Sequence, residues 1–287
     1  MLLSLPPSPS RLDIYNDLDT ELVNFYTCVQ ERTLVLMREL KFSFLHSRTL
    51  FEDLTRLMEH KEMHEQFLEE ELDCLKDRSM FTVEQAKILW PILQERKQLF
   101  DVYRAVAFYH GVRGSFSCTR TSFGVKPYDP ERFFHLIPPA AKRLKDVILE
   151  NKSAYQLIYE RDGPDVCFYI DPPYWSTEKT YLVVDRRKRQ SRFHMRLWQI
   201  VKKCQGKVIL SYNDCPAIRK LYGEHFYILA FSRANPLAHQ KESEFGELLI
   251  TNYDPRPYMK KQVSLFDAPE DKFQMELVNI PAHPIKL

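Results

Sequence analysis

Apolar and polar positions along this chain follow two patterns, one typical of strands and the other typical of helices. Short apolar runs rich in β-branched and aromatic residues predict strands at 13–15, 166–170, 207–212, 226–231 and 248–252. Between them, apolar residues recur at helical spacing, as with Leu197, Ile200 and Val201 within 193–204. Strands alternating with helices predict an α/β fold, with a largely parallel sheet and helices on both faces.

The stretch from 31 to 111 has a helical pattern throughout, and acidic residues are dense between 52 and 77. Thr82 and Gln85 have the spacing of a capping box that begins a new helix, and Pro91 predicts a kink or a restart. We therefore expect a helical insertion and recognition lobe at 31–135. It would interrupt one domain made of 1–30 and 136–255, with a flexible tail at 256–287.

Composition narrows the class of protein without naming a function. The 287 residues are 44% hydrophobic, enough for one sizeable core. A net charge of +2 argues neither for nor against nucleic acid. The six cysteines show no metal-ligand spacing, and neither a signal peptide nor a stretch of membrane-spanning length is present. We expect a monomeric, cytoplasmic protein without a metal.

Asp171, Pro172, Pro173 and Tyr174, followed by Trp175, come directly after the buried strand predicted at 166–170. This places a carboxylate at the carboxyl end of a strand, where open α/β sheets bind ligands. An amine conjugated to an aromatic ring is a poor nucleophile, because its lone pair is delocalised. Asp171 and the carbonyl of Pro172 would accept hydrogen bonds from such an amine, and Tyr174 would stack on the ring. The plainer interpretation is a strand exit broken by Asp and Pro.

These four residues resemble the catalytic motif of amino-methyltransferases that use S-adenosyl-L-methionine. The wider match is to Dam-type DNA adenine N6-methyltransferases of phages and restriction-modification systems, and it runs in order from about residue 12 to 254. It is carried by 14–19 with 23–25, 143–147, 206–214 and 247–253, while 108–124 is similar to the family's DNA-contacting hairpin. The resemblance implies a class I, Rossmann-like methyltransferase fold acting on an adenine flipped out of double-stranded DNA.

The resemblance also implies which residues bind the cofactor. Asp17 stands where the family places the acid that binds the ribose hydroxyls, Leu18 would line the adenine pocket, and Asp171 would lie beside the cofactor as well. Ser153 stands where many relatives carry Asp. The alternative for Asp17 is that it caps the helix expected at 20–29.

Basic residues in two segments are candidates for DNA contact: Arg113, Arg120 and Lys126 in the hairpin segment, and Arg186, Arg187, Lys188, Arg189 and Arg192 in the loop after the motif. Solvated basic loops are the alternative. In the tail, Gln262, Leu265 and Phe266 belong to a pentapeptide that resembles the peptide by which bacterial proteins bind the sliding clamp. A chance match, or a tail strand packed on the domain, is the alternative there.

One expected feature of the family is missing. Its Gly-rich cofactor loop has no counterpart, because the first of the 7 glycines is Gly111. The family's central first strand is absent too, so the strands at 13–15 and 166–170 are expected to lose a shared partner. We therefore expect weak cofactor binding and little turnover from the chain as written, with either a true start upstream or a decayed gene.

The sequence favours a site-specific adenine N6-methyltransferase of double-stranded DNA. Two alternatives stay open. The first is an amino-methyltransferase acting on RNA, protein or cytosine N4. The second is a catalytically dead remnant that binds at most DNA or the sliding clamp.

Overall fold

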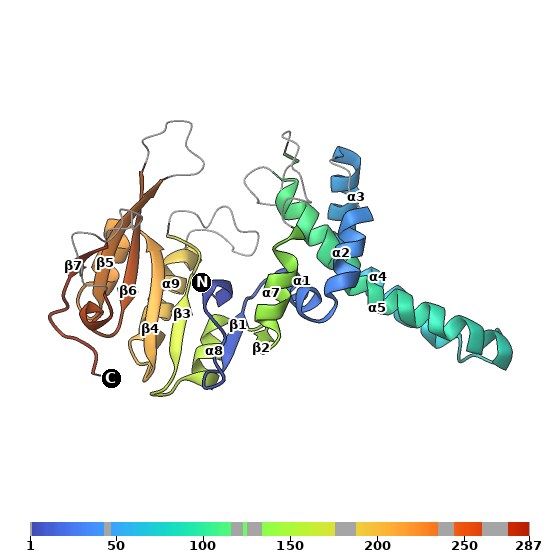
Figure 1. The fold of residues 1–287 in the computed structure, drawn as a ribbon, viewed down its shortest axis with the longest axis horizontal. Helices are drawn as coiled ribbons and strands as arrows, with labels where there is room; N and C mark the ends of the chain where they lie inside the picture. Colours follow the sequence, from blue (N-terminus) through green and yellow to red (C-terminus); the bar gives the residue numbers. More distant parts are fainter. Residues whose placement is uncertain are drawn as a thin grey trace. The chain divides into compact units, whose positions relative to one another are not determined.

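The computed structural model describes residues 2–42, 47–115, 123–124, 134–175, 188–234, 244–259 and 275–286. The chain divides into two compact units, an N-terminal unit (Met1–Ala154) and a C-terminal unit (Tyr155–Leu287). Figure 1 shows the elements of both. The strand at 13–16 and the strand at 147–150 lie in the N-terminal unit together with the helices of the expected insertion. The domain predicted from 1–30 and 136–255 stays a prediction.

The N-terminal unit combines a small sheet with a group of helices. Its elements are η1 (Leu2–Ser4), β1 (Asp13–Asn16), α1 (Thr20–Glu31), α2 (Thr33–Phe42), α3 (Arg48–Glu59), α4 (Lys61–Cys74), α5 (Val83–Arg113), α7 (Ile137–Leu144) and β2 (Val147–Glu150). Strands β1 and β2 pair in parallel from Asp13↔Val147 to Asn16↔Glu150. The strand pattern of β2 was not recognised in the sequence. Buried residues of α1, α2, α5, α7 and β2 form one core.

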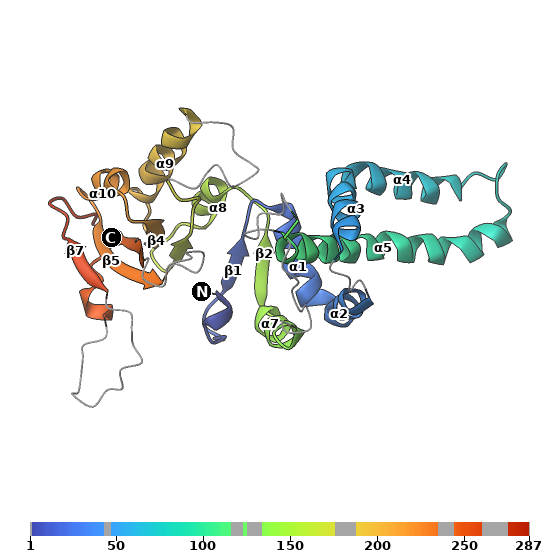
Figure 2. The same cartoon turned by 90° about the horizontal axis from the view of Figure 1, so that it is seen from above.

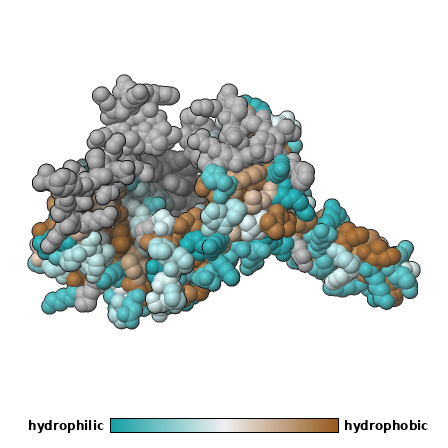
Figure 3. All heavy atoms as spheres, viewed as in Figure 1, coloured by the Kyte–Doolittle hydropathy of each residue, from teal (hydrophilic) through white to brown (hydrophobic). Residues whose placement is uncertain are grey.

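Helix α5 begins as the sequence predicts and is not interrupted at Pro91. Thr82 caps it, and both hydrogen bonds of the capping box with Gln85 are present. The helix continues through Pro91, so the restart predicted there does not occur. Helices α4 and α5 lie side by side (Figure 2) and are joined by an ion pair of 2.7 Å between Lys97 and Glu69. Apolar surface is visible on this helical pair (Figure 3), where exposed side chains include Phe67 and Ile88.

The C-terminal unit is built on a five-stranded sheet of order β3-β4-β6-β5-β7. Its elements are α8 (Ala154–Arg161), β3 (Cys167–Ile170), α9 (Lys188–Val201), β4 (Lys207–Asn213), α10 (Pro216–Tyr222), β5 (Tyr227–Ala234), β6 (Glu244–Thr251), η4 (Arg256–Tyr258) and β7 (Glu276–Asn279). Strands β3 and β4 are parallel, but β6 is antiparallel to both β4 and β5, and β7 is antiparallel to β5. The sheet is therefore mixed, and the expected parallel pairing holds at β3–β4 and in the separate β1–β2 pair.

Two further expectations for this unit need correction. Among the described residues of this unit, helices α8, α9 and α10 lie on one face of the sheet (Figure 2), where Leu197, Val201 and Ile218 share a core with strand residues, and no described helix of the unit lies on the other face. Strand β7 lies inside the range predicted as a flexible tail, so that prediction does not hold for Glu276–Asn279.

Strand β3 was expected to be buried, but two of its side chains, Cys167 and Tyr169, are exposed. The reason is that they alternate with the buried Phe168, so they lie on the face of the sheet opposite the core shared with the helices. In the part of the chain that the structure describes, β1 and β3 belong to separate sheets. Among the described helices, none is both long enough and apolar enough to cross a membrane.

Candidate active site

The motif found in the sequence lies where the parallel strand β3 ends. Asp171 follows Ile170, the last residue of the strand, and its side chain is exposed. Pro172 is buried, and the rings of Tyr174 and Trp175 pack against the core of the C-terminal unit. The two prolines have no N–H to donate and hold a narrow range of φ, so the backbone leaves the sheet here. An exposed carboxylate is thus followed by a stiff turn and two partly buried rings.

A serine on the neighbouring strand holds this carboxylate. Ser211 Oγ donates a hydrogen bond to Asp171 Oδ1 at 2.7 Å. The register of the parallel pair sets Ile170 opposite Leu210, so the next residues, Asp171 and Ser211, are level with each other. Ser211 lies in one of the segments that resemble the family, 206–214, but the sequence predicts no role for it, because strand register is not visible in sequence.

Behind the motif lies a second set of side chains that the sequence did not single out. The rings of Trp175 and His194 are 5.0 Å apart, and those of Tyr174 and Tyr212 are 6.4 Å apart. His194 Nδ1 and the Tyr212 hydroxyl share a hydrogen bond of 2.9 Å. Burial lowers the pKa of His194 to about 4, so its ring is neutral near pH 7. These contacts join the two aromatic rings of the motif to α9 and β4.

In the N-terminal unit, Asp17 follows the end of β1, as predicted. Its Oδ1 accepts a hydrogen bond from the Asp19 backbone N–H at 2.8 Å, and its Oδ2 lies 3.5 Å from the Tyr15 hydroxyl. Burial raises the pKa of the Asp17 carboxyl. The N-cap of α1 is Asp19, which accepts from the N–H groups of Glu21 and Leu22. Asp17 is therefore not the helix cap, which was the alternative interpretation.

The turns after β1 and β2 are tied to each other. Asn16 and Lys152 exchange two hydrogen bonds, of 2.9 and 3.0 Å, and the Asn151 side chain donates to the Asp17 carbonyl at 2.9 Å. Ser153 follows directly after these contacts, and Leu18, next to Asp17, is 60% exposed. The structure thus brings the predicted cofactor residues of this unit together beyond the carboxyl ends of β1 and β2.

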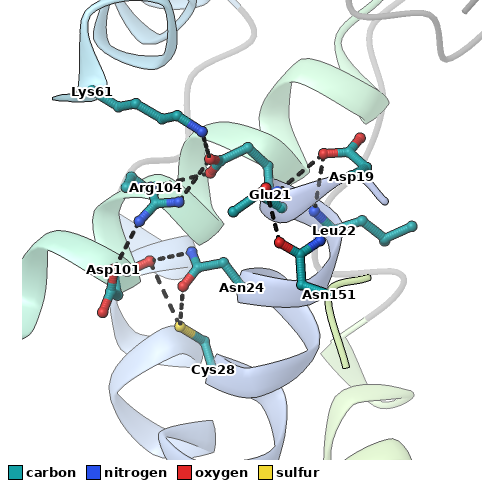
Figure 4. A network of polar contacts seen from close by, with 10 residues as sticks. Asp19, Glu21, Leu22, Asn24, Cys28, Lys61, Asp101, Arg104 and Asn151 are labelled. Atoms are coloured by element: carbon teal, nitrogen blue, oxygen red, sulfur yellow. Dashed lines mark hydrogen bonds and ion pairs between the residues drawn. The ribbon is translucent and has the colours of Figure 1, made fainter. Parts of the chain in front are cut away.

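A buried ion network secures the first turn of α1, just after the Asp19 cap (Figure 4). Glu21 Oε1 lies 2.7 Å from a guanidinium nitrogen of Arg104 on α5 and 2.7 Å from Lys61 Nζ on α4. Arg104 also pairs with Asp101 at 2.9 Å. Burial opposes the charge on Glu21, but the hydrogen bonds from Arg104 and Lys61 keep the pKa of its carboxyl below the usual value. Three helices are joined at this point.

The predicted DNA-contacting residues are only partly within the described residues. Arg113 ends helix α5, and beyond it an antiparallel bridge joins Ser115 to Phe123. Arg120 and Lys126 lie outside the described residues, as do Arg186 and Arg187 of the basic run and Gln262, Leu265 and Phe266 of the clamp-like peptide.

The rest of the basic run needs one correction. Lys188, Arg189 and Arg192 belong to the first turns of α9 and not to a loop, because the helix begins earlier than its apolar pattern indicates. Arg192 is exposed.

Comparison with known families identifies one match. Residues 13–233 match the family of D12 class N6 adenine-specific DNA methyltransferases. This range contains both Asp17 and Asp171, and it confirms the resemblance drawn from the motif and its flanking segments. A search of curated proteins found no match.

Proposed function

Because the chain belongs to the family of D12 class N6 adenine-specific DNA methyltransferases and is thus a DNA adenine methyltransferase, we propose that S-adenosyl-L-methionine is its methyl donor. The acceptor is N6 of an adenine flipped out of double-stranded DNA. The observation that carries this proposal is the carboxylate of Asp171 at the end of parallel strand β3, followed by a stiff turn and two rings. A base inside a duplex cannot reach such a group unless it leaves the stack.

Asp171 and Pro172 act on the amino group of the adenine. The carboxylate and the Pro172 carbonyl accept hydrogen bonds from its two N–H groups, which favours a tetrahedral nitrogen with a localised lone pair. Tyr174 stacks on the base and sets its plane, since its ring is itself held against the core. Bound S-adenosyl-L-methionine supplies an electrophilic methyl group. The residues of the chain supply orientation and charge at the nitrogen.

The residues at the carboxyl ends of β1 and β2 suit the nucleoside end of the cofactor. Asp17 has a partly buried carboxylate at the end of a parallel strand, the position at which Rossmann-like folds bind ribose hydroxyls. Leu18 adds an exposed apolar side chain for the adenine, and Ser153 adds a hydroxyl. Each carboxylate oxygen can accept more than one hydrogen bond, so the contact with the Asp19 N–H leaves Asp17 able to bind a hydroxyl.

Two features support the finer assignments of fold and DNA contact. Both proposed acids, Asp17 and Asp171, stand at carboxyl ends of parallel strands, as expected for a class I, Rossmann-like methyltransferase. Lys188, Arg189 and Arg192 begin α9, whose first turn contains no acidic residue. Positive side chains and the positive end of the helix dipole both attract an anion at a helix N-terminus, so a DNA phosphate suits this end of the helix.

The test compares three variants of the motif. Asp171→Ala should lower the rate of methyl transfer by at least about 1000-fold while DNA affinity and thermal unfolding stay unchanged, because the carboxylate acts mainly in the transition state. Tyr174→Ala should be severe and Tyr174→Phe mild, since stacking needs only the ring. Product analysis must find N6-methyladenine. Turnover retained in Asp171→Ala, or methylation at cytosine, would contradict the proposal.

A further inference from the structure

Asp171 is an exposed side chain that, among the residues the structure describes, is held by a contact from the neighbouring strand β4. That contact is the Ser211 hydroxyl, 2.7 Å from Oδ1. The same hydroxyl lies 3.4 Å from the carbonyl of Ile170. A serine hydroxyl has one proton to donate, and a charged acceptor at the shorter distance is favoured over a neutral one. The hydrogen bond to Asp171 is therefore the dominant one.

Ser211 is itself held rigidly. It is 6% exposed and lies in β4, between β3 and β6 in the sheet. The start of β4 approaches the turn before β3 so closely that a Cβ on Gly206 would lie 2.7 Å from the Val166 carbonyl oxygen. The Asn252 side chain accepts from the Val208 N–H and donates to the Gly206 carbonyl. These contacts set the register that brings Ser211 level with Asp171.

The contact leaves the carboxylate usable. A carboxylate has two oxygens, and the hydrogen bond from Ser211 engages Oδ1, so Oδ2 is left for a second donor. The hydrogen bond also limits rotation of the carboxyl group, which is otherwise free to rotate in an exposed aspartate. A catalytic group that is already held in its reactive orientation lowers the activation free energy, because the entropy cost of orienting it has been met before the reaction.

We propose that Ser211 is a positioning residue that orients the Asp171 carboxylate toward the amino group of the adenine. The inference rests on the proposed function, in which Asp171 accepts a hydrogen bond from that amine. Ser211 makes no contact with the substrate in this scheme; it acts through Asp171.

The kinetic test uses Ser211→Ala, Ser211→Thr and, as a matched control, Ser232→Ala on strand β5, where the serine is exposed. Ser211→Ala should lower the single-turnover rate roughly tenfold to a hundredfold, the loss expected for a hydrogen bond to a charged group. DNA affinity and thermal unfolding should not change. Ser211→Thr keeps the hydroxyl and should recover most of the rate, and Ser232→Ala should have no effect. An unchanged rate in Ser211→Ala would overturn the proposal.

A spectroscopic test does not depend on turnover. Subtracting the infrared spectrum of Asp171→Asn from that of the unaltered chain isolates the Asp171 carboxylate band. The same subtraction in the Ser211→Ala background should give a shifted and broader band, and Ser211→Thr should restore it. Identical bands would overturn the role of Ser211. If instead Asp171→Ala methylates at full rate while the bands differ, the proposed function of Asp171 fails and the Ser211 hydrogen bond stands.

Discussion

Asp17 and Asp171 occupy equivalent places, each directly after a four-residue strand of a parallel pair, yet they are held in different ways. Asp17 accepts from the backbone of its own turn, two residues away, and is partly buried. Asp171 is exposed and accepts from Ser211, forty residues away in the sequence. The first acid is positioned by local structure, whereas the second depends on the register between two strands.

The structure around each of the two acids is also stabilised by a different kind of interaction. The helix after Asp17 is secured by charges, with Glu21 buried between Arg104 and Lys61. The turn after Asp171 is secured by apolar and aromatic packing, with Trp175 against His194. A charged network tolerates the loss of one member poorly, because the remaining charge stays buried without its partner. The loss of a packed ring costs its buried apolar area and leaves a cavity, but it leaves no charge without a partner.

The largest effect is expected in the charged network of the N-terminal unit. Arg104→Met should lower the free energy of unfolding by about 3–5 kcal/mol, because Glu21 then remains buried with only Lys61 beside it. Arg96→Met is the matched control, since Arg96 is exposed and lies 3.9 Å from Glu71. Urea unfolding measures both variants. Equal losses in the two would show that the network does not secure α1.

A smaller effect should separate the roles of the two acids. Asp17→Asn should weaken binding of S-adenosyl-L-methionine about tenfold, equivalent to about 1.4 kcal/mol, because an amide is a poorer acceptor for ribose hydroxyls. Asp19→Asn removes the same charge from the same turn but keeps a good helix cap, so its affinity should not change. Calorimetric titration of both variants gives the comparison. If both variants weakened cofactor binding equally, Asp17 would contribute only through its negative charge.

The smallest effect should appear in DNA binding by the C-terminal unit. Arg192→Ala should weaken binding to all DNA sequences alike and make the plot of log affinity against log salt shallower by about one unit, the value for one lost phosphate contact. Lys203→Ala is the control, because Lys203 is exposed just beyond the other end of α9. Fluorescence anisotropy over a range of salt concentrations measures both slopes. If the slope stays the same in Arg192→Ala, Arg192 is a solvated side chain.

Most strands, the start of α5 and the family could be predicted from local sequence patterns. Strands β1, β3, β4, β5 and β6 lie close to their predicted places, and the capping box at Thr82 begins α5 as expected. The motif at Asp171 and its flanking segments predicted the family that residues 13–233 match. These features depend on residues near one another in the chain, where side-chain periodicity and hydrogen-bonding groups set the backbone.

Other features were decided only by tertiary structure. The sequence alone did not show that β6 runs antiparallel between β4 and β5, or that β7 joins the sheet. It did not pair Ser211 with Asp171 or His194 with Tyr212 either. Each of these is a contact between segments far apart in the chain. Their geometry follows from strand register and core packing, because a shift of one residue turns a side chain to the other face of the sheet.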